Sequence, residues 1–448
     1  MSTRSPGLPM MAAALAVAGV LLGLPAPKFS QAATGIEIID VLALYTPKAK
    51  AAAGGAAAIK KMIDDQVNVT NRVMTNSDTN SQIRLVGTEE LTGYEGVETT
   101  PREAAPVISA DENVAELRDE YGADLVTVFI GKTGQGDFYG VGSMPKSLPA
   151  GEDSVDQAHT VLDVKTTPPH GLAHELGHNL GGDHDWSTSP NSRYPGSAHN
   201  HGYGSPDKDW VTTMSYQGIC GGPCPAVPFY STPDKTWHGK PVGVGQSADA
   251  ENADIFARPA DNASVIKASA PGAAAYRESK SANSTVLVAK SSPVEGGVVE
   301  PRVPGPYAEK ARVAVRAIPA PGYTFTGWTL DGKPVPGNSP MTTVTMDAQR
   351  ELVATFEENA AVPLTVTIEN PEGGTLRSYP PVKAGEQEFP QGTVLSALQP
   401  IPAPGWEVVK WEITSGGQSG SSPPPIDEGI SFPLFQPFEF TVEFAKTG

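Results

Sequence analysis

Three of the chain's eight histidines fall within the eleven residues HELGHNLGGDH, from His174 to His184. His174 and His178 are four residues apart, so on a helix both imidazoles project from one face and can reach a single ion. Gly181 and Gly182 can adopt positive φ without steric cost, which allows the helix to end and the chain to bring His184 back to that ion. Three imidazoles leave one position open on a zinc ion, as in a catalytic site.

Glu175 follows the first of these histidines. A carboxylate at this position can accept a proton from an activated water molecule without being a metal ligand. The pattern therefore predicts metal-assisted hydrolysis. The alternative is an ordinary amphipathic helix with unrelated histidines, but the correctly spaced glycine and third histidine favour the metal site. The other histidines that stand out are interpreted as surface residues because the triad is complete: His170, His199, His201 and His238.

Strand and helix patterns alternate before this segment. Buried strands are predicted at 36–45 and 124–131, an alternating strand at 81–87, and helices around Ile59 to Met74 and at 112–121, the second ended by Gly122. This βαβαβ order predicts a parallel sheet with helices on its faces. The histidine helix is expected to start after Pro168 and Pro169. Residues 139–145, YGVGSMP, are either an exposed edge strand that could pair with an extended peptide or a loop.

The segment from His174 to His184 fits H-E-x-x-H-x-x-G-x-x-H, and the chain therefore resembles the metzincin metallopeptidases. Met214, within TTMSY, occupies the place of their methionine turn, and Asp185 follows the third histidine as in reprolysin-like members. Further segments resemble the bacterial peptidyl-Asp metalloendopeptidase group between Ile36 and Arg277: IDVLALYTPKAKAAAGG, YGADLV, LAHELGHN, NHGY and PFYSTPD.

The resemblance implies an α/β metzincin-type catalytic domain at 35–277, with a mixed, mostly parallel twisted sheet, an active-site helix and a small lower subdomain. It implies one catalytic zinc ion (Zn2+) and a protein or peptide substrate lying extended in a cleft. Met214 would form an apolar floor below the ligands, or equally be core. Tyr216 matches a tyrosine that binds zinc or the tetrahedral intermediate in some metzincins, although reprolysin-like relatives often lack that role. Asp185 is expected to hydrogen-bond neighbouring groups.

Two features depart from this pattern or limit it. Peptidyl-Asp enzymes carry additional cysteines before the active helix, and the corresponding stretch 155–171 here has none. The specificity pocket is therefore expected to differ. The sequence contains neither serralysin-type calcium repeats nor an EF-hand loop, so structural calcium (Ca2+) is unsupported.

The first 32 residues read as a cleaved secretory signal, with Arg4, the apolar run 10–24 and small residues at 30–32. A membrane anchor is the alternative, but fifteen residues are short for a span of about 20. Cleavage removes Arg4 and Lys28 and no acidic residue, so the net charge changes from -18 to -20. This negative charge argues against nucleic acid or anionic membranes as partners.

Cys220 and Cys224 are expected to form a local disulfide rather than remain free thiols, as suits an extracellular protein.

A tandem duplication follows a linker at 278–284. EGG recurs at Glu295 and Glu372, IPAPG at Ile318 and Ile401, and each IPAPG is followed by a tryptophan, Trp328 or Trp411. These units resemble bacterial repeat modules of the listeria-bacteroides type. Two small all-β domains are predicted, at 285–358 and 364–446 with a linker at 359–363. Aromatic residues such as Trp406 would bind a cell-surface or glycan ligand, or the tryptophans fill the two cores of passive spacers.

The sequence therefore predicts a secreted zinc endopeptidase, possessing no membrane span after the signal, that cleaves internal peptide bonds with Glu175 as general base. One alternative is a secreted adhesin that acts through its repeats and keeps an auxiliary metal domain. A metal domain that no longer acts as an enzyme would be expected to lose Glu175 or one of the three histidines, and all four residues are present. Another alternative keeps the zinc but hydrolyses a different amide, such as a glycan-linked one.

Overall fold

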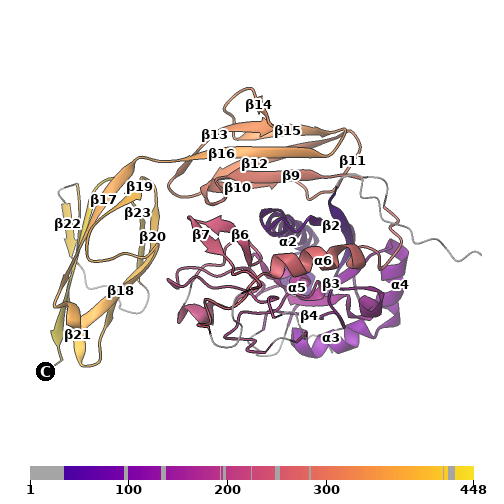
Figure 1. Ribbon diagram of the computed structural model, residues 1–448, viewed down its shortest axis with the longest axis horizontal. Helices are drawn as coiled ribbons and strands as arrows, with labels where there is room; N and C mark the ends of the chain where they lie inside the picture. The colour runs from indigo at the N-terminus through magenta and orange to yellow at the C-terminus, as the bar shows by residue number, and fades with distance from the viewer. Residues whose placement is uncertain are drawn as a thin grey trace, which may run out of the picture.

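The structure is a computed structural model that describes residues 35–94, 99–132, 138–191, 193–194, 198–222, 224–247, 253–281, 284–416, 418–421 and 429–447. The predicted signal at 1–32 lies outside the described residues. Figure 1 shows one α/β region followed by two β sandwiches. Among the described helices, none is long and apolar enough to cross a membrane.

A five-stranded sheet in the order β2-β1-β3-β5-β4 organises the α/β region. Its strands are β1 (Glu37–Tyr45), β2 (Ser81–Glu90), β3 (Leu125–Ile130), β4 (Gly140–Gly142) and β5 (His159–Asp163). All neighbours pair in parallel except β4, which runs antiparallel to β5 at the edge. The predicted mixed, mostly parallel sheet is confirmed, and YGVGSMP supplies its edge strand.

Helices cover both faces of this sheet because alternate side chains of the central strands point to opposite faces. From β1, Ile39 and Val41 enter one core, shared with α2 (Ala56–Asn76), α5 (Gly171–Asn179) and α6 (Asn262–Ala273). Leu42 and Leu44 enter the other core, shared with α3 (Pro101–Ser109) and α4 (Glu112–Tyr121). A short helix, α1 (Pro47–Ala53), follows β1 directly.

Sequence patterns missed β5, α3 and α6. The strand β5 is only five residues long, HTVLD, and has no extended alternation. The helices α3 and α6 each contain an internal proline, Pro106 or Pro271, which ordinarily argues against a helix interior. Tertiary packing overrides this local preference at both positions.

Among its described residues, the lower subdomain has little regular structure beyond the hairpin of β6 (Thr232–Trp237) and β7 (Lys240–Val242). Its cohesion comes from a separate aromatic core in which Tyr203, Trp210 and Phe229 are buried. The predicted disulfide between Cys220 and Cys224 is present and closes a loop beside the short helix η2 (Gln217–Cys220).

The two C-terminal units have the same strand arrangement, as their sequence duplication predicts. In each, a three-stranded sheet faces a larger sheet whose first and last long strands pair in parallel. The first unit comprises β8 (Ser284–Thr285), β9 (Leu287–Ser292), β10 (Gly297–Pro301), β11 (Tyr307–Ala308), β12 (Ala311–Pro319), β13 (Tyr323–Leu330), β14 (Lys333–Val335), β15 (Met341–Met346) and β16 (Arg350–Glu358). The second comprises β17 (Ala361–Glu369), β18 (Gly374–Tyr379), β19 (Gly385–Pro390), β20 (Val394–Pro402), β21 (Trp406–Ser415), β22 (Gln418–Ser421), β23 (Ile430–Pro433) and β24 (Phe438–Lys446).

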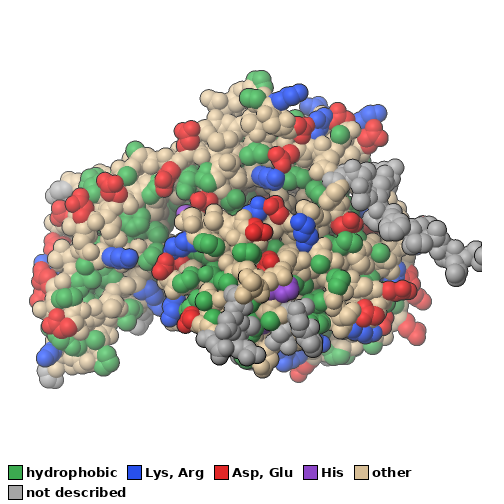
Figure 2. Space-filling view, in the orientation of Figure 1, with side chains coloured by type: hydrophobic (Ala, Val, Ile, Leu, Met, Phe, Trp, Pro, Cys, Tyr) green, Lys and Arg blue, Asp and Glu red, His purple; other side chains and the backbone are tan. Residues whose placement is uncertain are grey.

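The repeated tryptophans are core residues of these sandwiches. Trp328 and Trp411 are 3% and 5% exposed, and Trp406 is half-buried against the core of the second unit. Large aromatic side chains fill small β cores efficiently, so this burial accounts for the repeated tryptophans. On the face in Figure 2, acidic and basic side chains are interspersed over the surface.

The first repeat lies against the α/β region along α2 (Figure 1). The Asn68 amide of α2 donates to the Pro301 carbonyl, 3.3 Å away. On the same side, Val294 packs on the aromatic core of the lower subdomain. The first repeat therefore contacts both halves of the α/β region.

The segment expected as a linker at 278–284 is tied to the sheet by Arg84 of β2. The Arg84 guanidinium donates to Ser279 Oγ and Ser284 Oγ, each at 2.7 Å, and binds both carboxylate oxygens of Asp40 at 2.6 and 2.9 Å. The Asp40 side chain is 1% exposed and that of Arg84 14%. A buried carboxylate is thus neutralised by the residue that also anchors the chain leading to the repeats.

We predict that Arg84→Met lowers the free energy of unfolding by about 3 kcal/mol, because it leaves the buried Asp40 carboxylate without its charged partner. Denaturant titration followed by tryptophan fluorescence measures the change. Lys61→Met is the matched control, since Lys61 and Asp65 form an exposed pair with side chains 73% and 49% accessible, and such pairs contribute little. Equal effects of the two substitutions would contradict the assignment.

Candidate metal centre

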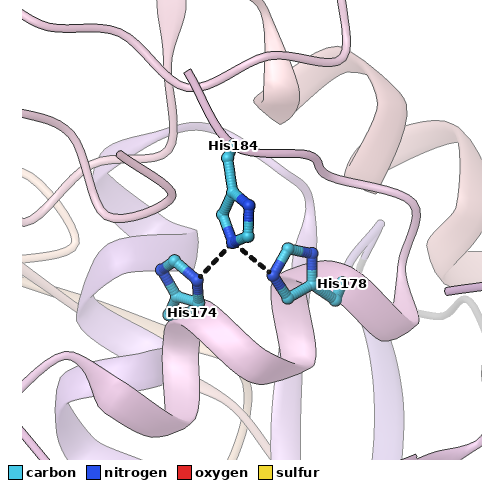
Figure 3. A group of neighbouring side chains, drawn as sticks. All are labelled: His174, His178 and His184. Atoms are coloured by element: carbon cyan, nitrogen blue, oxygen red, sulfur yellow. Dashed lines mark hydrogen bonds between the residues drawn. The ribbon is translucent and has the colours of Figure 1, made fainter. Parts of the chain in front are cut away.

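The three histidines converge on one point. His174 and His178 project from successive turns of α5, and His184 approaches from the loop after the helix (Figure 3). The Nε2 atom of His184 lies 3.1 Å from Nε2 of His174 and 3.0 Å from Nε2 of His178. Two nitrogen ligands of a tetrahedral zinc ion, each about 2.1 Å from the metal, are about 3.4 Å apart. Among the described residues, this is the one cluster of potential metal ligands.

Backbone carbonyls fix the orientation of the two helical imidazoles. His174 Nδ1 lies 2.8 Å from the Thr213 carbonyl oxygen, and His178 Nδ1 lies 2.8 Å from that of Gly182. A carbonyl only accepts hydrogen bonds, so each Nδ1 carries the proton and each Nε2 presents a lone pair to the centre. Burial lowers the pKa of His174 to about 3 and that of His184 to about 2. The neutral imidazoles thus have the protonation state that metal binding requires.

Side chains at both ends hold α5 in place. At its start, Gln66 of α2 accepts from the Leu172 amide and donates to the Pro168 carbonyl. At its end, the Asn179 amide group donates to the carbonyls of Ser143, on the β4 side, and His159 of β5. The helix begins after the two prolines, as predicted, and the histidines are fixed relative to the sheet.

Glycine makes the turn to His184. Gly181 has φ +94°, and a Cβ there would lie 2.2 Å from Leu148 Cδ2. Only glycine takes up this conformation without strain or collision. The helix therefore ends where the sequence predicted, and the chain reverses within three residues.

Glu175 lies beside the histidines, buried between α5 and the edge strand. A Cβ at Gly140 would be 2.6 Å from Glu175 Oε1, and one at Gly142 would be 2.2 Å from the Glu175 carbonyl oxygen. Both glycines of β4 thus allow the strand to lie directly on the helix. Burial raises the pKa of Glu175 to about 8, against a lowering effect of the Gly142 backbone hydrogen bond.

The segment 213–216 lies beneath the centre. Thr213 accepts from His174, and Met214 is fully buried. A Cβ on Gly177 would lie 2.4 Å from Met214 Sδ, so the methionine packs directly on the helix backbone at this glycine. Gly177 cannot be recognised from the sequence as a contact point, because a glycine within a helix has no spacing signal of its own.

Tyr216 and Asp185 join this segment to the loop of the third histidine. The Tyr216 ring lies 4.7 Å from that of His184 and 5.8 Å from that of His174, centroid to centroid. Burial raises the pKa of Tyr216 to about 12, with a further contribution from Glu175. Asp185 is fully buried and accepts from the backbone amides of Tyr216, Ser187 and Thr188.

These groups open into a cleft of about 390 Å³ that lies between β4 and the loop of His184. It is lined by the three histidines, Glu175 and Tyr216, together with Arg102, Phe138, Gly140, Val141, Gly142, Ser143, Met144, Gln157, Asp183 and Arg193. The two arginines were missed because they are far apart in the sequence and belong to no motif. His201, interpreted as a surface histidine, is fully buried, so that prediction is wrong.

Two regions of the chain are similar to known protein families. Residues 37–224 match metallo-peptidase family M12. This stretch is therefore similar to M12 metallopeptidase domains. Residues 287–360 match the divergent InlB B-repeat domain. The resemblances inferred from the sequence are thereby confirmed for the α/β domain and the first repeat.

Three relatives are named peptidyl-Asp metalloendopeptidase. That from Pseudomonas aeruginosa is 29% identical over 50% of this chain and 40% of its own length. Those from Stenotrophomonas maltophilia and Xanthomonas campestris pv. campestris are 28% and 26% identical, over 49% of this chain and 51% and 50% of their own lengths. The chain thus matches about half the length of these relatives or less. A solved chaperone-substrate complex matches 55% of this chain and 35% of its own with TM-score 0.42 and 23% identity.

We predict that Gly177→Ala destabilises the α/β domain despite the better helix propensity of alanine, which contributes about 1 kcal/mol. The added Cβ forces Met214 out of its place, and overpacking of this kind costs about 1–3 kcal/mol. Chemical denaturation measures the difference. Gly218→Ala is the control, since a Cβ at Gly218 meets no atom within 4 Å. A Gly177→Ala protein as stable as the parent would contradict the proposed packing constraint.

Proposed function

We propose that this protein is a secreted zinc endopeptidase that hydrolyses internal peptide bonds. The observation that carries the proposal is the convergence of three Nε2 lone pairs beside the buried Glu175 carboxylate, in an open cleft. The three-histidine donor set and its spacing fit zinc. The M12 match and the named relatives support the reaction class. The disulfide and the predicted signal segment support an extracellular location.

His174, His178 and His184 would hold the zinc ion. When bound, zinc supplies Lewis acidity, which polarises the scissile carbonyl and makes a water molecule more acidic. Glu175 would accept the proton of the attacking water and deliver it to the leaving amine. Burial raises the pKa of this carboxyl to about 8 when no cation lies beside it, and a cation held by the three histidines would lower that pKa and favour the ionised form that accepts the proton. Collapse of the tetrahedral intermediate then breaks the C–N bond.

The substrate would lie extended along β4. This strand is at the edge of the sheet, and its outer side has no partner strand among the described residues. An extended peptide can pair with such an edge through backbone hydrogen bonds. Because β4 lies directly on α5 at Gly142, a peptide paired with it passes close to Glu175 and the histidines.

Tyr216 would donate a hydrogen bond to the oxyanion of the tetrahedral intermediate. Its ring lies against two of the three imidazoles, and the raised pKa keeps its hydroxyl protonated at neutral pH. A neutral phenol suits this role because it donates without adding negative charge beside Glu175.

Arg102 and Arg193 would favour substrates with acidic side chains. Both are exposed at the cleft, and the name of the relatives, peptidyl-Asp metalloendopeptidase, denotes selectivity for aspartate. A guanidinium binds a carboxylate through two parallel hydrogen bonds. Arg102 also lies 4.5 Å over the ring of Phe138, which restricts its position.

The repeats would act as structural modules beside the peptidase domain. Burial of Trp328 and Trp411 and the contacts of the first repeat with α2 support this interpretation. Glycan binding through exposed aromatics is less well supported, since Trp406 also packs against its own core.

We predict that Glu175→Gln reduces kcat on casein at least a thousandfold while one zinc ion per chain remains bound. The amide keeps the shape of the side chain but cannot accept the proton. Fluorescent casein and elemental analysis provide the two measurements. His174→Ala is the matched variant and is expected to lose both activity and stoichiometric zinc. Full activity of the Gln variant would disprove the assignment of Glu175 as general base.

We predict that Tyr216→Phe lowers kcat about tenfold or more with little change in KM, because the lost hydrogen bond forms only in the transition state. Steady-state kinetics on a quenched peptide separates the two constants. A variant with unchanged kcat would contradict the proposed role, and so would one whose whole defect is in KM.

We predict that Arg102→Gln or Arg193→Gln lowers kcat/KM about tenfold for peptides with aspartate beside the cleaved bond. Peptides with asparagine in its place should be affected much less. Mass spectrometry of a peptide library compares the profiles of these variants. Arg312→Gln, in β12 of the first repeat, is the control for a charge change outside the cleft. An unchanged aspartate preference in both cleft variants would refute this proposal.

A further inference from the structure

The loop that carries His184 rests on a second segment, residues 200–202. The Asn200 side-chain amide donates to the Gly181 carbonyl at 2.9 Å, and the Asn200 carbonyl accepts from the Asp183 amide at 2.7 Å. The Gly202 amide donates to the Asp183 carbonyl at 3.0 Å. The two segments therefore lie side by side, with His201 paired with Asp183, the residue before the third histidine of the cluster.

His201 contacts this loop through both its ring edge and its ring face. Its Nδ1 atom lies 2.8 Å from the His184 carbonyl oxygen. Its ring stacks on Trp186, with centroids 3.9 Å apart and planes inclined by 26°. The ring is fully buried, and Nε2 has no hydrogen-bond partner within the described part of the chain.

The direction of the Nδ1 hydrogen bond follows from the chemistry of its partner. A carbonyl oxygen only accepts, so His201 Nδ1 carries the proton and donates it to His184. Nε2 makes no hydrogen bond among the described residues, so it does not explain why a histidine occupies this position. The hydrogen bond donated by Nδ1 does, because an apolar ring of similar size could not donate one.

Segment 200–202 is itself held from the other side. Ser231 Oγ donates to the His201 carbonyl at 2.6 Å. A Cβ on Gly202 would lie 2.5 Å from Ser215 Oγ, so this segment packs directly on the residue after Met214. A hydrogen bond from His201 thus connects the backbone of the third histidine to the methionine turn beneath the centre.

We propose that His201 is a positioning residue for the metal centre: its Nδ1–H holds the backbone of His184 so that the third imidazole meets the other two. This inference rests on the proposed zinc site. His174 and His178 are fixed by their helix, whereas His184 lies in a loop and needs an external partner to fix it. Groups that orient a metal ligand typically change metal affinity by about 10–100-fold when they are removed.

Three substitutions separate the hydrogen bond from the packing of the ring. Asparagine can place its amide nitrogen near the position of His201 Nδ1, so His201→Asn keeps the donor and loses the stack on Trp186. Phenylalanine keeps an aromatic ring on Trp186 and loses the donor. Glutamine places its amide nitrogen near the position of Nε2, away from the His184 carbonyl, and retains polarity without the hydrogen bond.

The experiment measures zinc affinity by competition with a chromophoric chelator, in full-length protein carrying Glu175→Gln so that it cannot digest itself. Thermal unfolding of the zinc-free proteins is recorded in parallel. We expect His201→Phe and His201→Gln to weaken zinc binding about tenfold or more, and His201→Asn to stay within about threefold of the parent. This order differs from the order of stability, in which the loss of the aromatic stack penalises His201→Asn.

Zinc affinity of the Phe and Gln variants equal to that of the parent would overturn the proposal. So would zinc affinities of the three variants that follow only the stabilities of the zinc-free proteins. If the Phe variant does not fold, the comparison of Gln with Asn provides the same test. Absence of zinc binding in the parent would instead contradict the proposed function itself, and a parent that binds zinc confines any failure to the role of His201.

Discussion

Three imidazole lone pairs directed at one point repel one another unless a cation lies between them. In this protein the arrangement is enforced from outside the cluster, because the carbonyls of Thr213 and Gly182 accept hydrogen bonds from the Nδ1–H groups of two histidines and leave both Nε2 lone pairs free to bind. Without a cation, this arrangement therefore lowers the free energy of unfolding, and binding of a metal ion would offset that loss. The helix end-caps, the glycine turn and the segment beneath the helix all serve to keep these rings in place.

Close backbone packing is the means by which the fold meets this constraint. Glycines at the contact points allow β4, the methionine turn and α5 to approach more closely than side chains would permit, as at Gly142 and Gly177. This brings Glu175 and the third histidine to the same side of one short helix. It also leaves the edge of the sheet beside the metal centre, where an extended peptide can pair.

The first repeat is joined to the α/β domain by side-chain contacts as well as by the connecting chain. Arg84 binds Asp40 in the sheet and two serines of the connecting segment. The first repeat then contacts α2 and, through Val294, the lower subdomain. Both halves contribute residues to the lining of the cleft.

The sequence by itself determined what depends on local spacing. Residues only a few positions apart encode the helical pair His174 and His178, the neighbouring Glu175, the glycine turn and the disulfide. The duplicated β units are visible because the same short motifs recur in both. The order of strands and helices predicted the parallel part of the sheet, whereas its mixed character was implied by the family resemblance. The elements β5, α3 and α6 were not predicted, because a short strand and helices with internal prolines carry weak local signals. Only the tertiary structure decided which distant residues meet the centre. Arg102 and Arg193 reach the cleft, and buried His201 reaches the third histidine, through loops whose paths are set by packing. No periodicity records such contacts, because their partners lie far away along the chain.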